Sequence, residues 1–314
     1  MNEQRQPRIG IIGAGAVGGF YGFMLAQVGF EVHYLLRSDY EAVNRHGLRI
    51  SSAVHGELHQ PQVHAWHDPA DMPPCDWVFV AAKTTSNTAL APIINQVAAQ
   101  HAKVVLLQNG FGIEDQIRPL LDEHLHLLGG LCFIYVHRSA PGVIQHQAQG
   151  GVNLGYHSGP ASGEDGAAIA QQGVSFFQHA GLDSKVLKVL EQARWQKLVW
   201  NIPYNGLSVL LNSDIEQLMS EAHSRELITQ LMDETIAAAQ ACGYALPDTM
   251  VQALLKYTDA MPAYFPSMYH DFAQKRPMEL QAIYHAPLAA AQAAGCSMPK
   301  TSMLVQTLEY LSAQ

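Results

Sequence analysis

The chain has 314 residues, a length that suggests about two domains. Hydrophobic residues make up 48% of it and charged residues only 14%, a composition that excludes a disordered chain, collagen and a long coiled coil. Eighteen Lys and Arg against 27 Asp and Glu give a formal net charge of -9. The sequence therefore lacks the basic surplus typical of a nucleic-acid-binding protein, and we expect no nucleic-acid partner.

Residues 9–30 carry no charge and follow two arginines, as a signal peptide or a membrane span would. The stretch contains seven glycines, however, and therefore makes a poor apolar segment for either. The four cysteines lie far apart in the sequence, which favours reduced thiols. We expect a cytoplasmic protein with no membrane partner.

The first elements form a βαβ unit. Residues 8–12 predict a buried strand, residues 17–28 a helix, and residues 31–36 a second strand. A unit of about thirty residues is typical of parallel strands joined by a crossover helix.

Strands and helices continue to alternate as far as residue 188, which predicts an α/β domain with a doubly wound parallel sheet of the Rossmann type. In chain order we expect a hairpin or irregular insertion at 49–64, a strand at 76–82, a helix at 87–100, a strand at 103–107, a helix at 113–121, two strands within 142–156 that could form an antiparallel edge, a helix at 167–180 and a strand at 184–189.

From residue 190 onward only helical patterns remain, at 191–201, 204–211, 220–241, 249–259, 267–274, 278–294 and 301–311. Pro203 is expected to kink the helical run or to restart it. We therefore expect a Rossmann domain at 1–188 and an all-helical domain at 189–314. Apolar runs such as 207–211 fit either a core or a dimer interface, so a monomer and a homodimer through the helical domain both stay open.

The six residues between the first strand and its helix fit the pattern G-x-G-x-x-G: Gly13, Ala14, Gly15, Ala16, Val17 and Gly18. In this context the first glycine permits a tight turn, the second lets the backbone approach a pyrophosphate, and the third lets the helix pack closely on the strand. The helix N-terminus adds exposed N–H groups and a positive dipole. The pattern predicts dinucleotide binding, and an ordinary glycine-rich turn is the alternative.

Arg37 ends the second strand, where an acidic residue would bind the ribose 2′-hydroxyl of NAD and a cation the 2′-phosphate of NADP. A guanidinium can bind a phosphate through two hydrogen bonds. We therefore expect NADP(H) as the cofactor of the first domain. Asp39 lies close enough to keep NAD open, and an ordinary surface role for Arg37 is the other alternative.

Two polar residues directly follow strands of the predicted sheet: Lys83 after the strand at 76–82, and Asn109 after the strand at 103–107. Ligands of such sheets lie beyond the carboxyl ends of the strands, so we expect both residues near the nicotinamide. A solvated lysine and an ordinary Asn-Gly turn are the alternatives.

The helical domain contains a polar series of its own. Lys197, Asn201 and Asn205 are spaced i, i+4 and i+8, so they would share one face of a continuous helix, where asparagines beside apolar neighbours are not ordinary solvent-facing residues. Helix caps around Pro203 are the alternative.

Two further features lie nearer the C-terminus. Ser267 and Asp271 form another i, i+4 pair. Glu279 falls in the first turn of an expected helix, where an acidic residue is an ordinary capping feature.

Taken together, these residues resemble the ketopantoate reductase (2-dehydropantoate 2-reductase) family of the wider 6-phosphogluconate dehydrogenase-like group, over residues 8–311. The resemblance implies NADPH-dependent reduction of ketopantoate, a small 2-oxo acid, to pantoate, in pantothenate and coenzyme A synthesis. It implies Lys197 as the general acid, Asn109 touching nicotinamide and substrate, and Lys83 near the cofactor ribose. It also implies that Asn201, Asn205 and Ser267 contact the substrate carboxylate and hydroxyl. Glu279 would have a catalytic role or contact the cofactor or the substrate.

Two departures from the family pattern bear on the substrate. Ser86 stands where the family usually has Gln, and the run after Glu279 lacks the expected Asp and Asn-Gly. A reductase of another 2-oxo acid and a non-catalytic NADP-binding protein therefore stay open. The sixteen histidines show no zinc-ligand spacing, so no metal site is expected.

Overall fold

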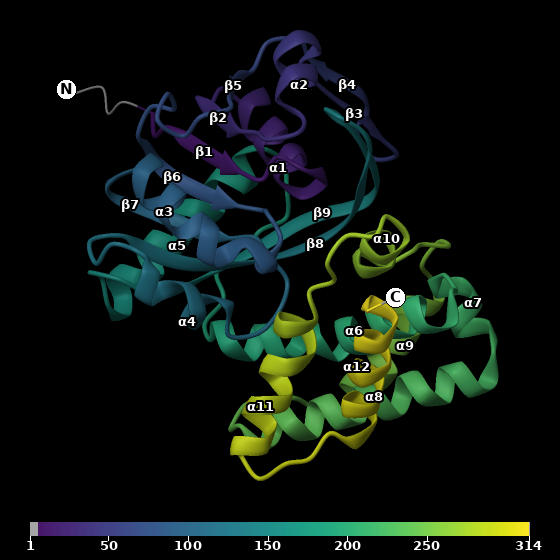
Figure 1. Cartoon of the computed structure of the whole chain (residues 1–314). Coiled ribbons are helices and arrows are strands. Elements are labelled where there is room, and N and C mark those ends of the chain that lie inside the picture. Colours follow the sequence, from purple (N-terminus) through teal and green to yellow (C-terminus); the bar gives the residue numbers. More distant parts are fainter. Residues whose placement is uncertain (1–5, 314) are drawn as a thin grey trace. The chain divides into compact units, whose positions relative to one another are not determined.

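The computed structural model describes residues 6–313 (Figure 1). They group into two compact units, one made of residues up to 108 together with 114–190, the other of residues 109–113 together with 191 onward. The first unit is an α/β unit built on a mixed, largely parallel sheet, and the second unit is helical, as the sequence predicts. The assignment of cofactor and substrate roles to the ranges 1–188 and 189–314 stays a prediction.

Within the described residues, the first unit is built on a nine-stranded sheet in the order β4-β3-β9-β8-β7-β6-β1-β2-β5. Neighbouring strands are parallel except for β3 with β4 and β8 with β9. The strands are β1 Ile9–Ile12, β2 Val32–Leu35, β3 Leu48–Ser52, β4 Gly56–Gln60, β5 His64–Trp66, β6 Cys75–Val80, β7 Ala98–Leu106, β8 His126–Ala140 and β9 Val143–Ser158.

The helices of this unit are α1 Ala16–Gln27, α2 Tyr40–His46, α3 Asn87–Val97, α4 Ile113–Ile117 and α5 Gly163–His179, with short 3-10 turns η1 Thr84–Ser86 and η2 Arg118–Leu120. Helices α1 and α5 share one core, in which the Phe177 ring lies 5.5 Å from Tyr21 and 5.3 Å from Phe79. Helix α3 packs against β6 and β7 (Figure 1). Strand β1 lies between β2 and β6, so the strand order reverses there, and ligands of open α/β sheets bind at that position.

The first unit differs from the sequence expectations at four places. Strand β8 was not expected, and residues 142–156 lie in the single strand β9, which pairs with β3 and β8 inside the sheet and is no edge. The β8–β9 ladder shifts register at four places, which disrupts the alternation that would reveal such long strands. Residues 184–189 make only one parallel bridge, Leu154 to Val186. Helix α3 ends at Val97, because the next residues already belong to β7.

The second unit consists of α6 Leu190–Leu211, α7 Ile215–Ser220, α8 Ala222–Ala241, α9 Met250–Asp259, α10 Ser267–Ala273, the π-helical turn η3 Gln281–His285, α11 Ala286–Ala293 and α12 Pro299–Ser312. Its core is centred on the fully buried side chains of Trp195, Tyr204 and Tyr284. Helix α6 runs through Pro203 without ending, so the expected restart is wrong. Proline removes one backbone hydrogen bond, and buried side chains on both sides of it hold the helix in place. None of the helices in residues 6–313 has an apolar run long enough to cross a bilayer.

Candidate active site

The glycine loop adopts the geometry that its pattern predicts. A Cβ atom on Gly13, where φ is +85°, would lie 2.4 Å from the Ala82 backbone nitrogen, and one on Gly18 would lie 2.5 Å from the Gly13 carbonyl oxygen. A Cβ on Gly15 would meet nothing within 4 Å. Gly13 and Gly18 are therefore required for close packing, whereas Gly15 leaves space above the backbone for a ligand.

The N-terminus of α1 suits an anion. No side chain caps it, and its first turn contains no acidic residue. The backbone N–H groups of a first helical turn lack intrahelical acceptors and carry a positive partial charge. Together with the open space at Gly15, they fit the pyrophosphate of a dinucleotide.

The end of β2 separates Arg37 from Asp39. Arg37 is exposed, and among the described residues no hydrogen bond or ion pair engages its guanidinium. Asp39 is only 4% exposed, and its carboxylate accepts hydrogen bonds from Arg138 Nη1 (2.5 Å), Ser38 Oγ (2.9 Å) and the Gly142 backbone N–H (3.4 Å). The acidic group that kept NAD open is therefore already engaged within the protein.

A buried amide joins the ends of β6 and β7. Gln108 Nε2 donates to the Ala82 carbonyl oxygen at 2.7 Å and to Asn87 Oδ1 at 2.6 Å. Ala82 precedes the half-buried Lys83, so this bridge fixes the backbone before Lys83 relative to the sheet, and Gln108 is the last residue before Asn109. Sequence reasoning missed Gln108, although its position at a strand end was the signal already used for Asn109.

The segment that carries Asn109 packs with the helical unit. The Phe111 backbone N–H donates to the Ala282 carbonyl oxygen at 2.9 Å, and the Phe111 ring lies 4.7 Å from that of Trp195. A Cβ on Gly110 would lie 2.4 Å from that of Ala282, at a φ of +119°. Asn109 Oδ1 is buried and has no hydrogen-bond partner in the described residues.

Because α6 is continuous, Lys197, Asn201 and Asn205 lie on one face of it at successive turns. Asn205 is committed to structure: its Nδ2 donates to the Asn201 carbonyl oxygen at 3.0 Å, and its Oδ1 accepts from the Met268 backbone N–H at 3.3 Å. Asn201 is 5% exposed, and its Nδ2 is buried with no partner among the described residues. Lys197 is half-buried one turn away.

Asn205 also fixes the start of α10, where Ser267 is the first residue and half-buried. The buried Asp271 of this helix forms an ion pair with Arg276 Nη2 at 3.1 Å, so it stabilises the end of α10. Met268, the residue after Ser267, is thus held at the polar face of α6 by Asn205, and the role of Ser267 stays a prediction.

Glu279 is 5% exposed and lies two residues before η3, so the expected helix over 278–294 begins at Leu280 and continues as a π-helical turn. π-helical turns are rare and frequently occur at functional sites. The Tyr284 hydroxyl of η3 donates to the Ile202 carbonyl oxygen at 2.9 Å, which ties this turn to α6. Burial raises the pKa of Tyr284 well above its usual value, so the phenol remains a proton donor.

The predicted residues therefore fall into two groups. The glycine loop, Arg37 and Lys83 lie in the first unit, and the remaining six lie in the second: Asn109, Lys197, Asn201, Asn205, Ser267 and Glu279. Within residues 6–313 no cluster of His, Cys, Asp or Glu has the arrangement of a metal site.

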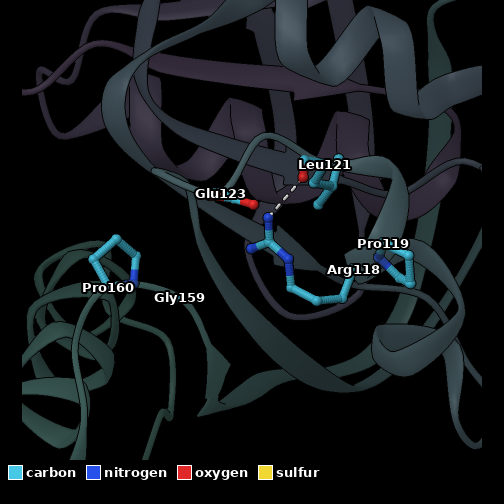
Figure 2. A pocket seen from close by; sticks show the side chains of 6 residues that line it. All are labelled: Arg118, Pro119, Leu121, Glu123, Gly159 and Pro160. Carbon is cyan, nitrogen blue, oxygen red and sulfur yellow. Dashed lines mark hydrogen bonds between the residues drawn. The ribbon is translucent and has the colours of Figure 1, made fainter.

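A surface hollow elsewhere in the first unit contains none of these residues. It is lined by Arg118, Pro119, Leu121, Glu123, Gly159 and Pro160, as Figure 2 shows. The Arg118 guanidinium donates to the backbone carbonyl oxygens of Leu121, Asp122 and Leu125, so it holds the turn after η2.

Family models match both units. The model described as ketopantoate reductase PanE/ApbA matches residues 9–159, and the model for the C-terminal part of the same family matches residues 189–311. A 2-dehydropantoate 2-reductase from Nostoc sp. (strain PCC 7120) is 41% identical over 314 residues, which cover 100% of this chain and 97% of that protein.

Solved structures agree with these matches. The crystal structure of 2-dehydropantoate 2-reductase from Geobacter metallireducens GS-15 is 37% identical, with a TM-score of 0.90 over 96% of this chain and 99% of that one. A D-mandelate dehydrogenase solved with NADH and anilino(oxo)acetate shares the fold alone, with a TM-score of 0.85 over 98% of each chain at 20% identity. The chain belongs to the ketopantoate reductase family.

Proposed function

We propose that this protein catalyses the NADPH-dependent reduction of 2-dehydropantoate (ketopantoate) to pantoate, a step in pantothenate and coenzyme A synthesis. The observation that carries the proposal is the polar face of α6 in a chain of this family. There Lys197 stands one turn from Asn201, whose buried Nδ2 lacks a partner among the described residues. An unpaired buried amide costs free energy unless a ligand supplies the acceptor, and the substrate carboxylate is such an acceptor.

The residues of the first unit fit NADP(H). The loop Gly13–Gly18 and the N-terminus of α1 would hold the pyrophosphate, Arg37 the 2′-phosphate, and Lys83 the ribose. Asn109, whose Oδ1 has no hydrogen-bond partner among the described residues, would contact the nicotinamide amide. The engagement of Asp39 by Arg138 favours NADP over NAD, because the Asp39 carboxylate is neutralised and is already a hydrogen-bond acceptor within the protein.

When bound, NADPH supplies the hydride that reduces the 2-oxo carbon. The Lys197 ammonium group donates a proton to the oxygen on which negative charge develops, which stabilises that charge. Asn201 and Ser267 bind and orient the substrate, and Asn205 holds both in place. Glu279, buried two residues before η3, accepts a hydrogen bond from the substrate or cofactor.

The test is NADPH oxidation at 340 nm with ketopantoate, run beside pyruvate and branched 2-oxo acids, with NADH as the cofactor control. Fast turnover with ketopantoate supports the proposal. Faster turnover with another acid would leave the mechanism in place and make that 2-oxo acid the substrate. The altered run after Glu279 and Ser86 motivate this alternative. NADPH binding without turnover on any acid would favour a non-catalytic NADP-binding protein. Cytoplasmic location and a monomeric or homodimeric state stay predictions.

A further inference from the structure

The Asp39 carboxylate has unusual hydrogen-bond partners for a residue at the start of a helix. It is the N-cap residue of α2, yet its side chain caps no N–H of that helix. Asp is a preferred N-cap because its carboxylate ordinarily accepts from the first helical turn. Here the carboxylate instead accepts from Arg138 and Gly142, which lie about a hundred residues further along the chain, and from Ser38.

The charge balance around Arg37 depends on this contact. Residues 37–46 contain two arginines, Arg37 and Arg45, and two acidic residues, Asp39 and Glu41, whose formal charges cancel. Arg138, at the far end of β8, contributes the charge that makes the segment net positive. Without it, a buried carboxylate would stand two residues from the guanidinium that has to bind a 2′-phosphate.

We propose that Arg138 determines cofactor specificity: by neutralising Asp39, it allows the end of β2 to bind the 2′-phosphate of NADPH. The inference rests on the proposed use of NADP(H) and extends it to a residue outside the nucleotide-binding βαβ unit. Arg138 need not touch the cofactor. It acts on the 2′-phosphate through the charge of Asp39, so its effect has to differ between NADPH and NADH.

The size of the effect follows from charge separation. Two successive Cα–Cα steps put the Cα atoms of Arg37 and Asp39 at most about 7.6 Å apart, so a phosphate on the Arg37 guanidinium would lie on the order of 10 Å from the Asp39 carboxylate. A phosphate carries a charge of about -2 at neutral pH. At an effective dielectric constant between that of a protein surface and that of water, an uncompensated carboxylate at this distance weakens phosphate binding roughly ten-fold. NADH has no 2′-phosphate, so its affinity changes by less than about two-fold on the same reasoning.

The experiment measures the dissociation constants of NADPH and NADH for the full chain by nicotinamide fluorescence at low salt. Arg138→Leu is expected to weaken NADPH roughly ten-fold while leaving NADH nearly unchanged. Adding Asp39→Asn to that variant is expected to restore NADPH binding, because the unpaired charge is removed, and Arg138→Lys is expected to retain most of it.

A matched control is Arg225→Leu. Arg225 has the same 36% side-chain exposure as Arg138 and forms an ion pair with Asp259, in the helical unit. Its loss is expected to leave the ratio of the two dissociation constants unchanged. Should Arg138→Leu fail to fold, Asp39→Asn in the wild-type background tests the same charge and is expected to favour NADPH further.

The outcomes separate this inference from the cofactor proposal. A wild-type protein that binds NADH as tightly as NADPH overturns the NADP(H) assignment and the inference with it. A wild-type preference for NADPH that survives Arg138→Leu unchanged overturns the inference alone. Equal loss of both cofactors, or no rescue by Asp39→Asn, shows that Arg138 serves only the local structure.

Discussion

Adding a single methyl group to two glycines of the same loop is expected to have different effects, one on stability and the other on cofactor binding. Gly13→Ala adds a Cβ that would lie 2.4 Å from the Ala82 nitrogen, at a φ of +85°. Gly15→Ala adds a Cβ that meets nothing within 4 Å, at a φ of -73°. The first change should therefore lower stability, and the second should block the cofactor.

The magnitudes follow from these distances. A positive φ costs an alanine roughly 1–2 kcal/mol, and an overpacked contact adds about 1–3 kcal/mol. Gly13→Ala should therefore lower the free energy of unfolding by about 2–5 kcal/mol, or Tm by roughly 5–15 °C. Gly15→Ala should change it by less than about 1 kcal/mol. Its methyl group would occupy the space needed for close approach of the pyrophosphate, so NADPH binding should weaken at least about ten-fold.

Thermal unfolding without cofactor and NADPH titration by fluorescence measure the two effects. Gly56→Ala is a matched control, because Gly56 has a φ of +77° and open space around its Cβ position, so this variant reports the backbone cost alone. If Gly13→Ala costs no more than Gly56→Ala, the close approach to Ala82 is refuted. Unchanged NADPH affinity in Gly15→Ala would refute the placement of the pyrophosphate.

Lys197→Ala should lower kcat by roughly 10²–10⁴ with little change in NADPH affinity, and wild-type turnover in stopped-flow assays would remove Lys197 from the catalytic step. Arg37→Ala should weaken NADPH far more than NADH, whereas equal loss of both would show that Arg37 does not bind the 2′-phosphate. The hydrogen bond from Arg8, assisted by His33, lowers the pKa of Glu31 from 4.5 to about 2. Its stabilising contribution is present above pH 4.5 and is lost as the pH falls towards 2, so urea unfolding of Glu31→Gln should differ most from wild type above pH 4.5. A difference in the free energy of unfolding that does not depend on pH would contradict the lowered pKa of Glu31.

The sequence predicts the part of the sheet whose signals are local. The glycine loop, β1, α1, β2 and β6 each show their pattern within a few residues, and the structure confirms them. Strand β8 was not predicted because its pairing with β9 includes register shifts, and neither strand alternates cleanly between buried and exposed residues over its length. Strand pairing of this kind depends on a distant partner, which no single segment encodes.

The candidate site follows the same division. The i, i+4, i+8 spacing of Lys197, Asn201 and Asn205 was sufficient to place them on one helical face, because helix geometry is local. The bridge made by Gln108 and the engagement of Asp39 by Arg138 were not predicted. Each depends on which buried donor meets which acceptor across the sheet, and spacing in the sequence carries no information on that.

The excursion of residues 109–113 has a consequence for how the two units can be separated. The Phe111 ring packs at a tilt against that of Trp195, and its backbone N–H donates to the Ala282 carbonyl oxygen, so a few residues embedded in the first unit's sequence complete the core of the second. A fragment that begins at residue 191 would lack this piece and would expose the aromatic surface that it covers. A chimaera that joins the two units at a single crossover near residue 190 would pair this core with a foreign 109–113 segment, so exchange of the helical unit requires residues 109–113 of the same protein.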